Sequence, residues 1–303
     1  MKDYAEISKE VQLAISLKKP IVALESTLIS HGLPYPDNIK VANDSIKAVQ
    51  DSGAVAATIG IINGKIKVGL SKDDIETLAK DNNVQKVSNH NLSITVFKKQ
   101  NAATTVASTI SIASYFDIKF FATGGIGGVH LGYEKTNDIS SDLYALSEYS
   151  NYVICSGAKS ILDLHKTYEL LETLGVTRIG YLTDYMPGFW YSETSHRVDE
   201  SFKDVSKICK FLKLREKMKS KKSVLIFNKV PDNDALNKDN IDVWIKNSMK
   251  KAHVKKIKGK ELTPFLINEI NNESNNLTLK TNTSLIINNA YLAGKLSKEY
   301  YSN

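Results

Sequence analysis

Side chains able to do acid–base or nucleophilic chemistry follow apolar runs in this 303-residue sequence. Glu25 comes directly after "IVAL", and Lys159 comes shortly after "YVIC". A lysine held between apolar elements loses its charge easily and can then attack a carbonyl carbon. A carboxylic acid in a similar position can carry protons to and from a ligand. The alternatives are a loop carboxylate with satisfied hydrogen bonds for Glu25 and an ion pair at a helix start for Lys159.

A glycine-rich segment follows another apolar run, with four glycines among the five residues of "GGIGG", 124–128. A P-loop would place a lysine and then a serine or threonine directly after the last glycine, where Val129 and His130 stand here. A dinucleotide-binding fingerprint would need a third glycine at the position of His130. Both nucleotide motifs are therefore disfavoured. What remains is a loop whose backbone N–H groups can approach a ligand closely, with His130 as either a ligand-binding or a structural histidine.

A polar cluster occupies "TNDISSDL", 136–143, and includes Asp138, Ser140, Ser141 and Asp142. These residue types cap helix N-termini, where they accept backbone N–H bonds and complement the helix dipole. They also suit a hard metal ion or the hydroxyl groups of a sugar. Elsewhere, Lys86 near the end of an apolar run is either an anion clamp or a surface charge.

Alternating apolar runs and amphipathic segments predict the elements that position these residues. Strands are expected at 20–24, 54–62, 65–70, 84–88, 118–125, 152–157, 178–183 and 223–227. Helices are expected at 8–19, after "PYPD", at 72–81, 103–116, from about 140, and at 160–175, 201–218, 235–252, 261–272 and 282–299. The Asn-Gly pair at 63–64 predicts a tight hairpin turn.

Strands that alternate with helices predict an α/β fold of three layers, α/β/α, around a mostly parallel central sheet. No linker divides the chain, so residues 1–303 are expected to form a single domain. Ligands bind where parallel strands end, which selects the loops after Leu24, Ser88, Ala122 and Gly157. The two cysteines are expected to be reduced and structural, in a cytoplasmic protein without a signal peptide or membrane span.

The net charge is +7, and the excess lies mainly in residues 213–222 and 246–260. Aromatic residues do not interleave with these lysines, as they do in many surfaces that bind single-stranded nucleic acid. The stretches are therefore interpreted as solvated helix faces, and no nucleic-acid partner is expected.

Long motifs also occur along the chain in a characteristic order. They include "VALESTLISHGLPYPDN", "ATTVAST", "FATGGIGGVH", "DISSDL", "GAKSILDL" and "NTSLIINNA". Together, from about Lys18 to the C-terminus, they strongly resemble the pseudouridine-5′-phosphate glycosidase family. The resemblance implies an α/β/α enzyme that splits pseudouridine 5′-phosphate reversibly into uracil and ribose 5-phosphate. It further implies a homotrimer and a divalent metal, commonly Mn²⁺, with Mg²⁺ as the alternative.

The family motifs also imply roles for individual residues. Lys159 corresponds to the covalent nucleophile, Glu25 to the proton donor and Asp138 to the metal ligand. The other residues that correspond to substrate contacts are Lys86, Val106, Ser140, Ser141, Asp142 and Asn282. The chain departs from the family pattern at Asn89, His90 and Asn91, where relatives commonly carry two arginines and an aspartate, and at Leu131, where they commonly carry an arginine.

The implied residues suit cleavage of a carbon–carbon bond, the one between C1′ of ribose and C5 of uracil. A carbon leaving group has no lone pair to protonate, so the two-carboxylate design of ordinary glycosidases does not apply. An imine between a lysine and C1′ of a ring-opened sugar would allow the carbon–carbon bond to break, with Glu25 supplying a proton. Two alternatives remain open: another Schiff-base lyase acting on a different phosphosugar and, because of the departures, a catalytically altered sugar-phosphate-binding protein.

Overall fold

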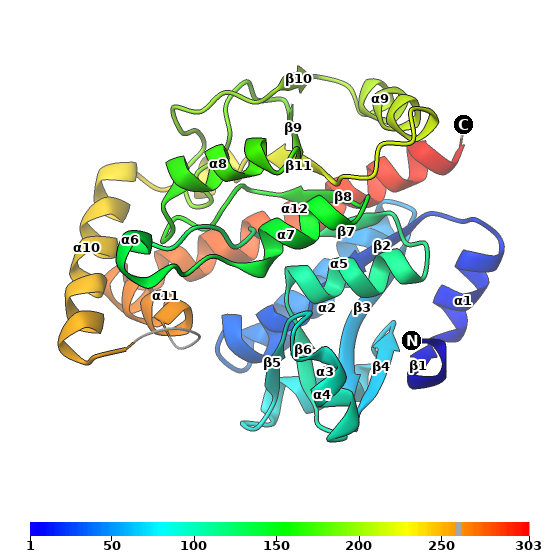
Figure 1. Cartoon of the computed structure of the whole chain (residues 1–303), viewed down its shortest axis with the longest axis horizontal. Helices are drawn as coiled ribbons and strands as arrows, with labels where there is room; N and C mark the ends of the chain where they lie inside the picture. Colours follow the sequence, from blue (N-terminus) through cyan, green and yellow to red (C-terminus); the bar gives the residue numbers. More distant parts are fainter. Residues whose placement is uncertain (258–261, 303) are drawn as a thin grey trace.

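The computed structural model describes residues 1–257 and 262–302, and within these residues eleven strands form one sheet (Figure 1). The strands are β1 (Ala5–Ile7), β2 (Ile21–Leu24), β3 (Val55–Ile62), β4 (Lys65–Val68), β5 (Gln85–Val87), β6 (Ala102–Thr104), β7 (Phe120–Ala122), β8 (Tyr152–Cys155), β9 (Thr177–Tyr181), β10 (Glu200–Phe202) and β11 (Val224–Asn228). Their order is β1-β4-β3-β2-β7-β8-β11-β9-β10, and β6 pairs with β3 and β5. Only the pairs β3–β4 and β3–β6 are antiparallel within the described residues, which confirms the mostly parallel sheet.

Helices cover both faces of this sheet (Figure 1). They are α1 (Lys9–Ser16), α2 (Asp37–Asp51), α3 (Lys72–Lys80), α4 (Leu92–Phe97), α5 (Val106–Tyr115), α6 (Tyr133–Thr136), α7 (Ser141–Glu148), α8 (Leu164–Thr173), α9 (Val205–Lys217), α10 (Lys238–Val254), α11 (Leu262–Glu273) and α12 (Leu277–Ser302). Apolar residues of β2 alternate between two cores, because successive strand residues point to opposite faces. Val22 packs in the core that includes α2, α9 and α12, whereas Ala23 packs in the core that includes α5, α7 and α8. The three-layer α/β/α architecture is therefore confirmed.

The hairpin between β3 and β4 turns at the predicted Asn-Gly pair. Asn63 and Gly64 have φ angles of 50° and 75°. A two-residue turn with both central residues in the left-handed region matches the right-handed twist of the flanking strands. The turn therefore has the chemistry expected from the sequence.

Several predicted boundaries were wrong. Residues 102–104 form β6 rather than the start of a helix, because their backbone pairs with both β3 and β5, and α5 begins only at Val106. The helix predicted at 160–175 begins at Leu164, where Asp163 caps it by accepting the N–H of Lys166 at 3.1 Å. The helix predicted at 201–218 begins at Val205, after the unpredicted strand β10. Strand β1 and helix α4 were also not predicted.

Other expectations concern the chain as a whole. Cys155 and Cys209 are free and buried, as expected. The basic stretches lie largely on α9 and α10, while residues 258–260 of the second stretch, and residue 261 of the helix predicted at 261–272, lie outside the described residues. Among the helices of the described residues, none combines the length and the apolar character that crossing a membrane requires.

Candidate active site

Glu25 lies at the carboxyl end of β2, beside the residue that follows β7. Parallel pairing sets Leu24 opposite Ala122, so Glu25 and Thr123 leave the sheet side by side. Thr123 Oγ1 donates a hydrogen bond to Oε1 of Glu25, which is only 7% exposed. Burial raises the pKa of Glu25, since the charged form loses its hydration, while the positive charge of Lys159 and the Thr123 hydrogen bond act in the opposite direction. The net rise favours the protonated form, which a proton donor needs.

Lys159 lies in the loop that connects β8 to α8. This loop runs alongside the glycine-rich segment: the N–H of Ile126 donates to the carbonyl of Gly157, and the N–H of Lys159 donates to the carbonyl of Ile126, both at 3.1 Å. The lysine is half-buried. Burial raises the pKa of Glu25, and among the influences that lower this pKa the positive charge of Lys159 is the largest. The two groups proposed from sequence as nucleophile and acid therefore interact electrostatically across the carboxyl edge of the sheet.

Lys86 and Asp142 complete a charged cluster with Glu25 and Lys159. Lys86, from β5, is half-buried. Burial and the charge of Lys159 lower its pKa, while the charges of Asp142 and Glu25 raise it. The structure thus brings four of the predicted site residues, from four different parts of the chain, close enough to interact electrostatically (charged cluster: Glu25, Lys86, Asp142 and Lys159).

Asp142 also holds the backbone of the site. Its Oδ1 accepts the N–H of Ala107 at 2.9 Å, and its Oδ2 accepts the N–H of Gly127 at 2.8 Å. Ser140 caps α7, because its hydroxyl accepts the N–H of Asp142 at 3.2 Å. The capping interpretation of this segment is therefore confirmed, and Asp142 joins the start of α5 to the glycine-rich segment while it contributes charge to the cluster.

Three more predicted contact residues have protein partners. The hydroxyl groups of Ser141 and Ser88 lie 2.7 Å apart, which ties α7 to the end of β5. Val106 is buried as the first residue of α5. Asn282, on α12, is buried as well, and its Oδ1 accepts the indole N–H of Trp190 at 2.7 Å.

The glycine-rich segment is shaped by its protein neighbours. None of its glycines adopts a positive φ angle. A Cβ atom at Gly125 would lie 2.6 Å from Cδ2 of Phe189, and one at Gly127 would lie 2.8 Å from Oδ2 of Asp142. A Cβ atom at Gly128 would collide with Thr167. Close packing therefore requires glycine at these positions.

The departures from the family pattern are accommodated locally. Asn91 Oδ1 accepts the N–H of Ser88 at 2.8 Å, and Asn91 Nδ2 donates to the carbonyl of Lys86 at 3.2 Å. Asn91 thus closes the turn that follows β5 and supports the strand that carries Lys86. Leu131 lines a cleft of about 670 Å³ that Leu162 and Ile245 also line.

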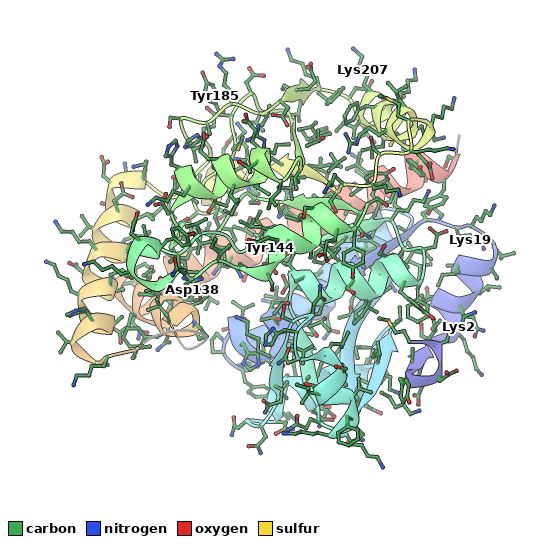
Figure 2. The ribbon with its side chains drawn as sticks, in the orientation of Figure 1. Lys2, Lys19, Asp138, Tyr144, Tyr185 and Lys207 are labelled. Atoms are coloured by element: carbon green, nitrogen blue, oxygen red, sulfur yellow. The ribbon has the colours of Figure 1, made fainter. Side chains whose placement is uncertain are left out.

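Asp138 lies on the segment between α6 and α7, where Figure 2 labels it. It is half-buried. His130 lies nearby: burial lowers its pKa, and the charge of Asp138 acts in the opposite direction. No group of three or more His, Cys, Asp and Glu side chains within residues 1–257 and 262–302 is arranged to hold a metal ion. An ion that takes one carboxylate and keeps most of its waters fits Asp138, whereas tetrahedral zinc does not.

Two residues of the site were missed from the sequence. Thr123 follows β7 directly, so the rule that selected Glu25 would have found it. His31 lies in η2, a π-helical segment (Leu28–Gly32). Burial and the charge of Lys86 lower the pKa of His31, and its Nε2 is buried without a hydrogen-bond partner among the described residues. A single histidine in a loop gave no signal of this placement.

A buried acid and two half-buried lysines lie toward the carboxyl edge of the sheet of this α/β fold. Such a site is typical of enzymes that combine acid–base catalysis with an amine nucleophile. Residues 10–299 match the model of the family described as indigoidine synthase A like protein, and the chain belongs to this family. It is 45% identical to the pseudouridine-5′-phosphate glycosidase of Geobacillus kaustophilus, with 99% of each chain covered. It is also 45% identical to the enzyme of that name from Petrotoga mobilis, with 98% of this chain and 97% of the relative covered. The resemblance inferred from the motifs is confirmed.

Two solved structures share the fold. The prealnumycin C-glycosynthase AlnA, solved in complex with ribulose 5-phosphate, superimposes with a TM-score of 0.90 at 33% identity, covering 98% of this chain and 97% of that one. An indigoidine synthase A-like protein from Thermotoga maritima has a TM-score of 0.87 at 32% identity, with 93% of each chain covered.

Proposed function

We propose that this protein cleaves the carbon–carbon glycosidic bond of pseudouridine 5′-phosphate to uracil and ribose 5-phosphate, reversibly, through an imine at Lys159. The observation that carries the proposal is the electrostatic interaction of half-buried Lys159 with a buried Glu25 whose pKa burial raises. The names of the full-length relatives support the substrate.

The ligand of a solved relative supports an open-chain sugar. Ribulose 5-phosphate, bound in the C-glycosynthase structure, cannot close a five-membered ring through its phosphorylated 5-hydroxyl, so its carbonyl group stays free. A site of this fold that accepts such a sugar phosphate is suited to the ring-opened ribose 5-phosphate that an imine mechanism requires.

The reaction balances with the residues of the charged cluster. The neutral amine of Lys159 forms a bond to C1′ as the bond from C1′ to the ring oxygen breaks, and the proton that the nitrogen then loses is taken up by that oxygen. The nitrogen lone pair then forms the C1′=N bond while the bond from C1′ to C5 of uracil breaks, and Glu25 gives its proton to C5. Water hydrolyses the imine, which releases ribose 5-phosphate and returns the proton to Glu25. Covalent catalysis of this kind divides one difficult step into easier ones.

Sodium borohydride tests the covalent step. With ribose 5-phosphate present, we expect reduction of the imine to leave a stable mass increase on the peptide that carries Lys159. Lys159→Ala is expected to lose both the adduct and turnover, while the protein still binds ribose 5-phosphate in calorimetry. Near-normal turnover by Lys159→Ala would refute the imine and leave Lys159 as an electrostatic partner of Glu25.

The remaining predicted residues have roles in binding under this proposal. Lys86 supplies positive charge to the phosphorylated sugar, and Ser140, Ser141, Asp142, Val106 and Asn282 line the substrate site. Because both oxygens of Asp142 already accept backbone N–H groups, its part is to hold the glycine-rich segment against the sugar.

Asp138 is the proposed ligand of a divalent cation, Mn²⁺ or Mg²⁺. Such an ion, when bound, orders water molecules and oxygen atoms of the sugar phosphate. We expect exhaustive chelation to abolish turnover and Mn²⁺ to restore it. Asp138→Ala is expected to bind Mn²⁺ weakly in paramagnetic resonance titrations and to behave like the chelated protein. Full turnover after chelation would contradict this role.

A further inference from the structure

One buried amide on α12 connects the two loops that carry the reacting groups. Asn289 is 0% exposed. Its Nδ2 donates to the carbonyl of Thr123 at 2.9 Å and to the hydroxyl of Ser156 at 3.1 Å, and it lies 3.4 Å from the carbonyl of Gly124. Its Oδ1 accepts the Nδ2 of Asn228, at the end of β11, at 3.1 Å. A side chain with both donor and acceptor atoms thus joins the carboxyl ends of β7, β8 and β11.

Two partners of Asn289, Thr123 and Ser156, lead to the charged cluster. The hydroxyl of Thr123 donates to Glu25, so the position of the Thr123 backbone determines where this hydroxyl lies relative to the acid. Ser156 begins the loop to Lys159, its N–H donates to the carbonyl of Gly124 at 2.9 Å, and its carbonyl accepts the N–H of Phe189 at 2.9 Å. Glu25 and the loop that carries Lys159 are therefore both connected to the side-chain amide of Asn289. No ligand can contact this amide, because Asn289 is fully buried.

We propose that Asn289 is a positioning residue that sets the distance between Glu25 and Lys159. The proposal rests on the proposed function for the reaction that this distance serves. An apolar side chain at position 289 would leave the Thr123 carbonyl and the Ser156 hydroxyl without their partner, and buried polar groups do not stay unpaired without cost. The loops would then shift to find other partners, and a misplacement of about 1 Å can cost about 100-fold in rate.

The test compares Asn289→Leu with Asn288→Leu. Asn288 precedes Asn289 on the same helix, is only half-buried, and donates to the carbonyl of Lys229 at 3.3 Å. We expect Asn289→Leu to lower kcat on pseudouridine 5′-phosphate about 100-fold, with a much smaller change in KM. Asn288→Leu should keep nearly the parent rate. Equal effects of the two variants, or an unchanged kcat in Asn289→Leu, would overturn the proposal.

A double-mutant cycle separates positioning from general destabilisation. If Asn289 acts through Thr123, the kcat loss in Asn289→Leu combined with Thr123→Val is smaller than the product of the two single losses. Losses that simply multiply would overturn this route. Should Asn289→Leu fail to fold, Ser156→Ala removes a single buried hydroxyl from the same network, and we expect slower borohydride trapping at Lys159 with unchanged binding of ribose 5-phosphate; an unchanged trapping rate would overturn the proposal.

Hydrogen exchange measures the positioning role without catalysis. In Asn289→Leu, peptides covering residues 120–130 and 152–163 should exchange faster than in Asn288→Leu, while the rest of the chain is unchanged. Parent protein that does not turn over pseudouridine 5′-phosphate would refute the proposed function, and the exchange result would still decide the role of Asn289. Unchanged exchange in both peptides would overturn the positioning role even in an active enzyme.

Discussion

The hydroxyl of Thr123 contributes to the acidity of Glu25, after burial and the charge of Lys159. Burial drives the pKa of this carboxyl upward, and the hydrogen bond from Thr123 partly reverses the rise, since it stabilises the charged form. A proton donor works best when its pKa lies near the working pH. The Thr123 hydroxyl is therefore expected to limit the rise of the Glu25 pKa, so that the carboxyl group can both bind a proton and release it.

Thr123→Val should move the pH dependence of cleavage to higher pH. Without the hydroxyl, the pKa of Glu25 rises further, so Glu25 stays protonated to a higher pH, and the alkaline limb of kcat shifts upward. Proton release becomes harder, so we expect the plateau of kcat to fall about 10-fold, within the range of a general acid–base contribution. The profile of kcat against pH from 5 to 10 measures both effects.

Thr58→Val is the matched control, because Thr58 on β3 is buried and its hydroxyl has no hydrogen-bond partner among the described residues. The same substitution there should leave the pH profile in place. An alkaline limb of Thr123→Val that stays where the parent protein has it, or that moves to lower pH, would show that this hydroxyl does not set the pKa of Glu25.

At the scale of elements, the site depends on how closely three segments approach one another. The glycine-rich segment runs between the loop after β8 and the start of α7, with backbone hydrogen bonds on one side and the Asp142 carboxylate on the other. This proximity explains why side chains are missing from Gly125 and Gly127. A glycine is required here because of packing rather than because of a left-handed backbone conformation.

Gly127→Ala should damage stability and activity together. The added methyl group would collide with Ser140 and lie 2.8 Å from Oδ2 of Asp142, which must then release the N–H that it accepts. Overpacking of this kind costs about 1–3 kcal/mol in the free energy of unfolding. We expect a loss of that size in urea denaturation, together with a lower kcat/KM, since the segment supports Lys159.

The control is Gly32→Ala, where the nearest atoms to an added methyl group lie 3.6 Å away and φ is not positive. This variant should lie within about 1 kcal/mol of the parent protein, the size of an unstrained change from glycine. Parent-like stability and activity in Gly127→Ala would mean that the segment moves freely and does not position the lysine.

Patterns of this sequence predicted most of the fold and part of the site. The β3–β4 turn and the sheet could be predicted, because turn chemistry and strand–helix alternation are local signals. The strand at residues 102–104 could not, because small residues such as Ala103 fit a helix or a buried strand equally well and only pairing with β3 and β5 decides between them. The segment at Lys159 was predicted as the start of a helix for a similar reason. It forms a loop instead, because backbone hydrogen bonds hold it against the glycine-rich segment, which is distant in sequence.

Their places after apolar runs made Glu25 and Lys159 candidates and the family motifs implied their roles, whereas their connection through Asn289 could not be predicted. An asparagine inside an amphipathic helix usually faces solvent, and its hydrogen bonds to β7, β8 and β11 depend on how α12 crosses the sheet (Figure 1). Contacts between segments more than a hundred residues apart leave no periodic pattern in either segment.

At the scale of the whole molecule, the raised pKa of Glu25 makes the stability of the fold depend on pH. A carboxyl group that prefers its protonated form when folded binds protons more tightly in the folded state than in the unfolded state. Stability then falls as the pH rises, because the slope of the unfolding free energy with pH follows the difference in bound protons, unfolded minus folded. The contribution of Glu25 is therefore fully present below the unfolded pKa, about 4.3, and is lost as the pH rises through the folded pKa, which burial raises.

Glu25→Gln should accordingly stabilise the protein at neutral and alkaline pH while it stops cleavage. The amide keeps an oxygen that can accept the Thr123 hydroxyl, and it removes the buried charge. Each unit by which the pKa is raised corresponds to about 1.4 kcal/mol, so the gain over the parent protein should be small near pH 4, grow as the pH rises, and become constant once Glu25 is fully ionised. Urea denaturation of both proteins at pH 4, 6 and 8 measures the gain. Glu10→Gln, at an exposed position on α1, corrects for loss of a surface charge. A gain that shrinks as the pH rises would show that Lys159 and Lys86 stabilise the ionised acid more than burial destabilises it, and that Glu25 is not held as a proton donor.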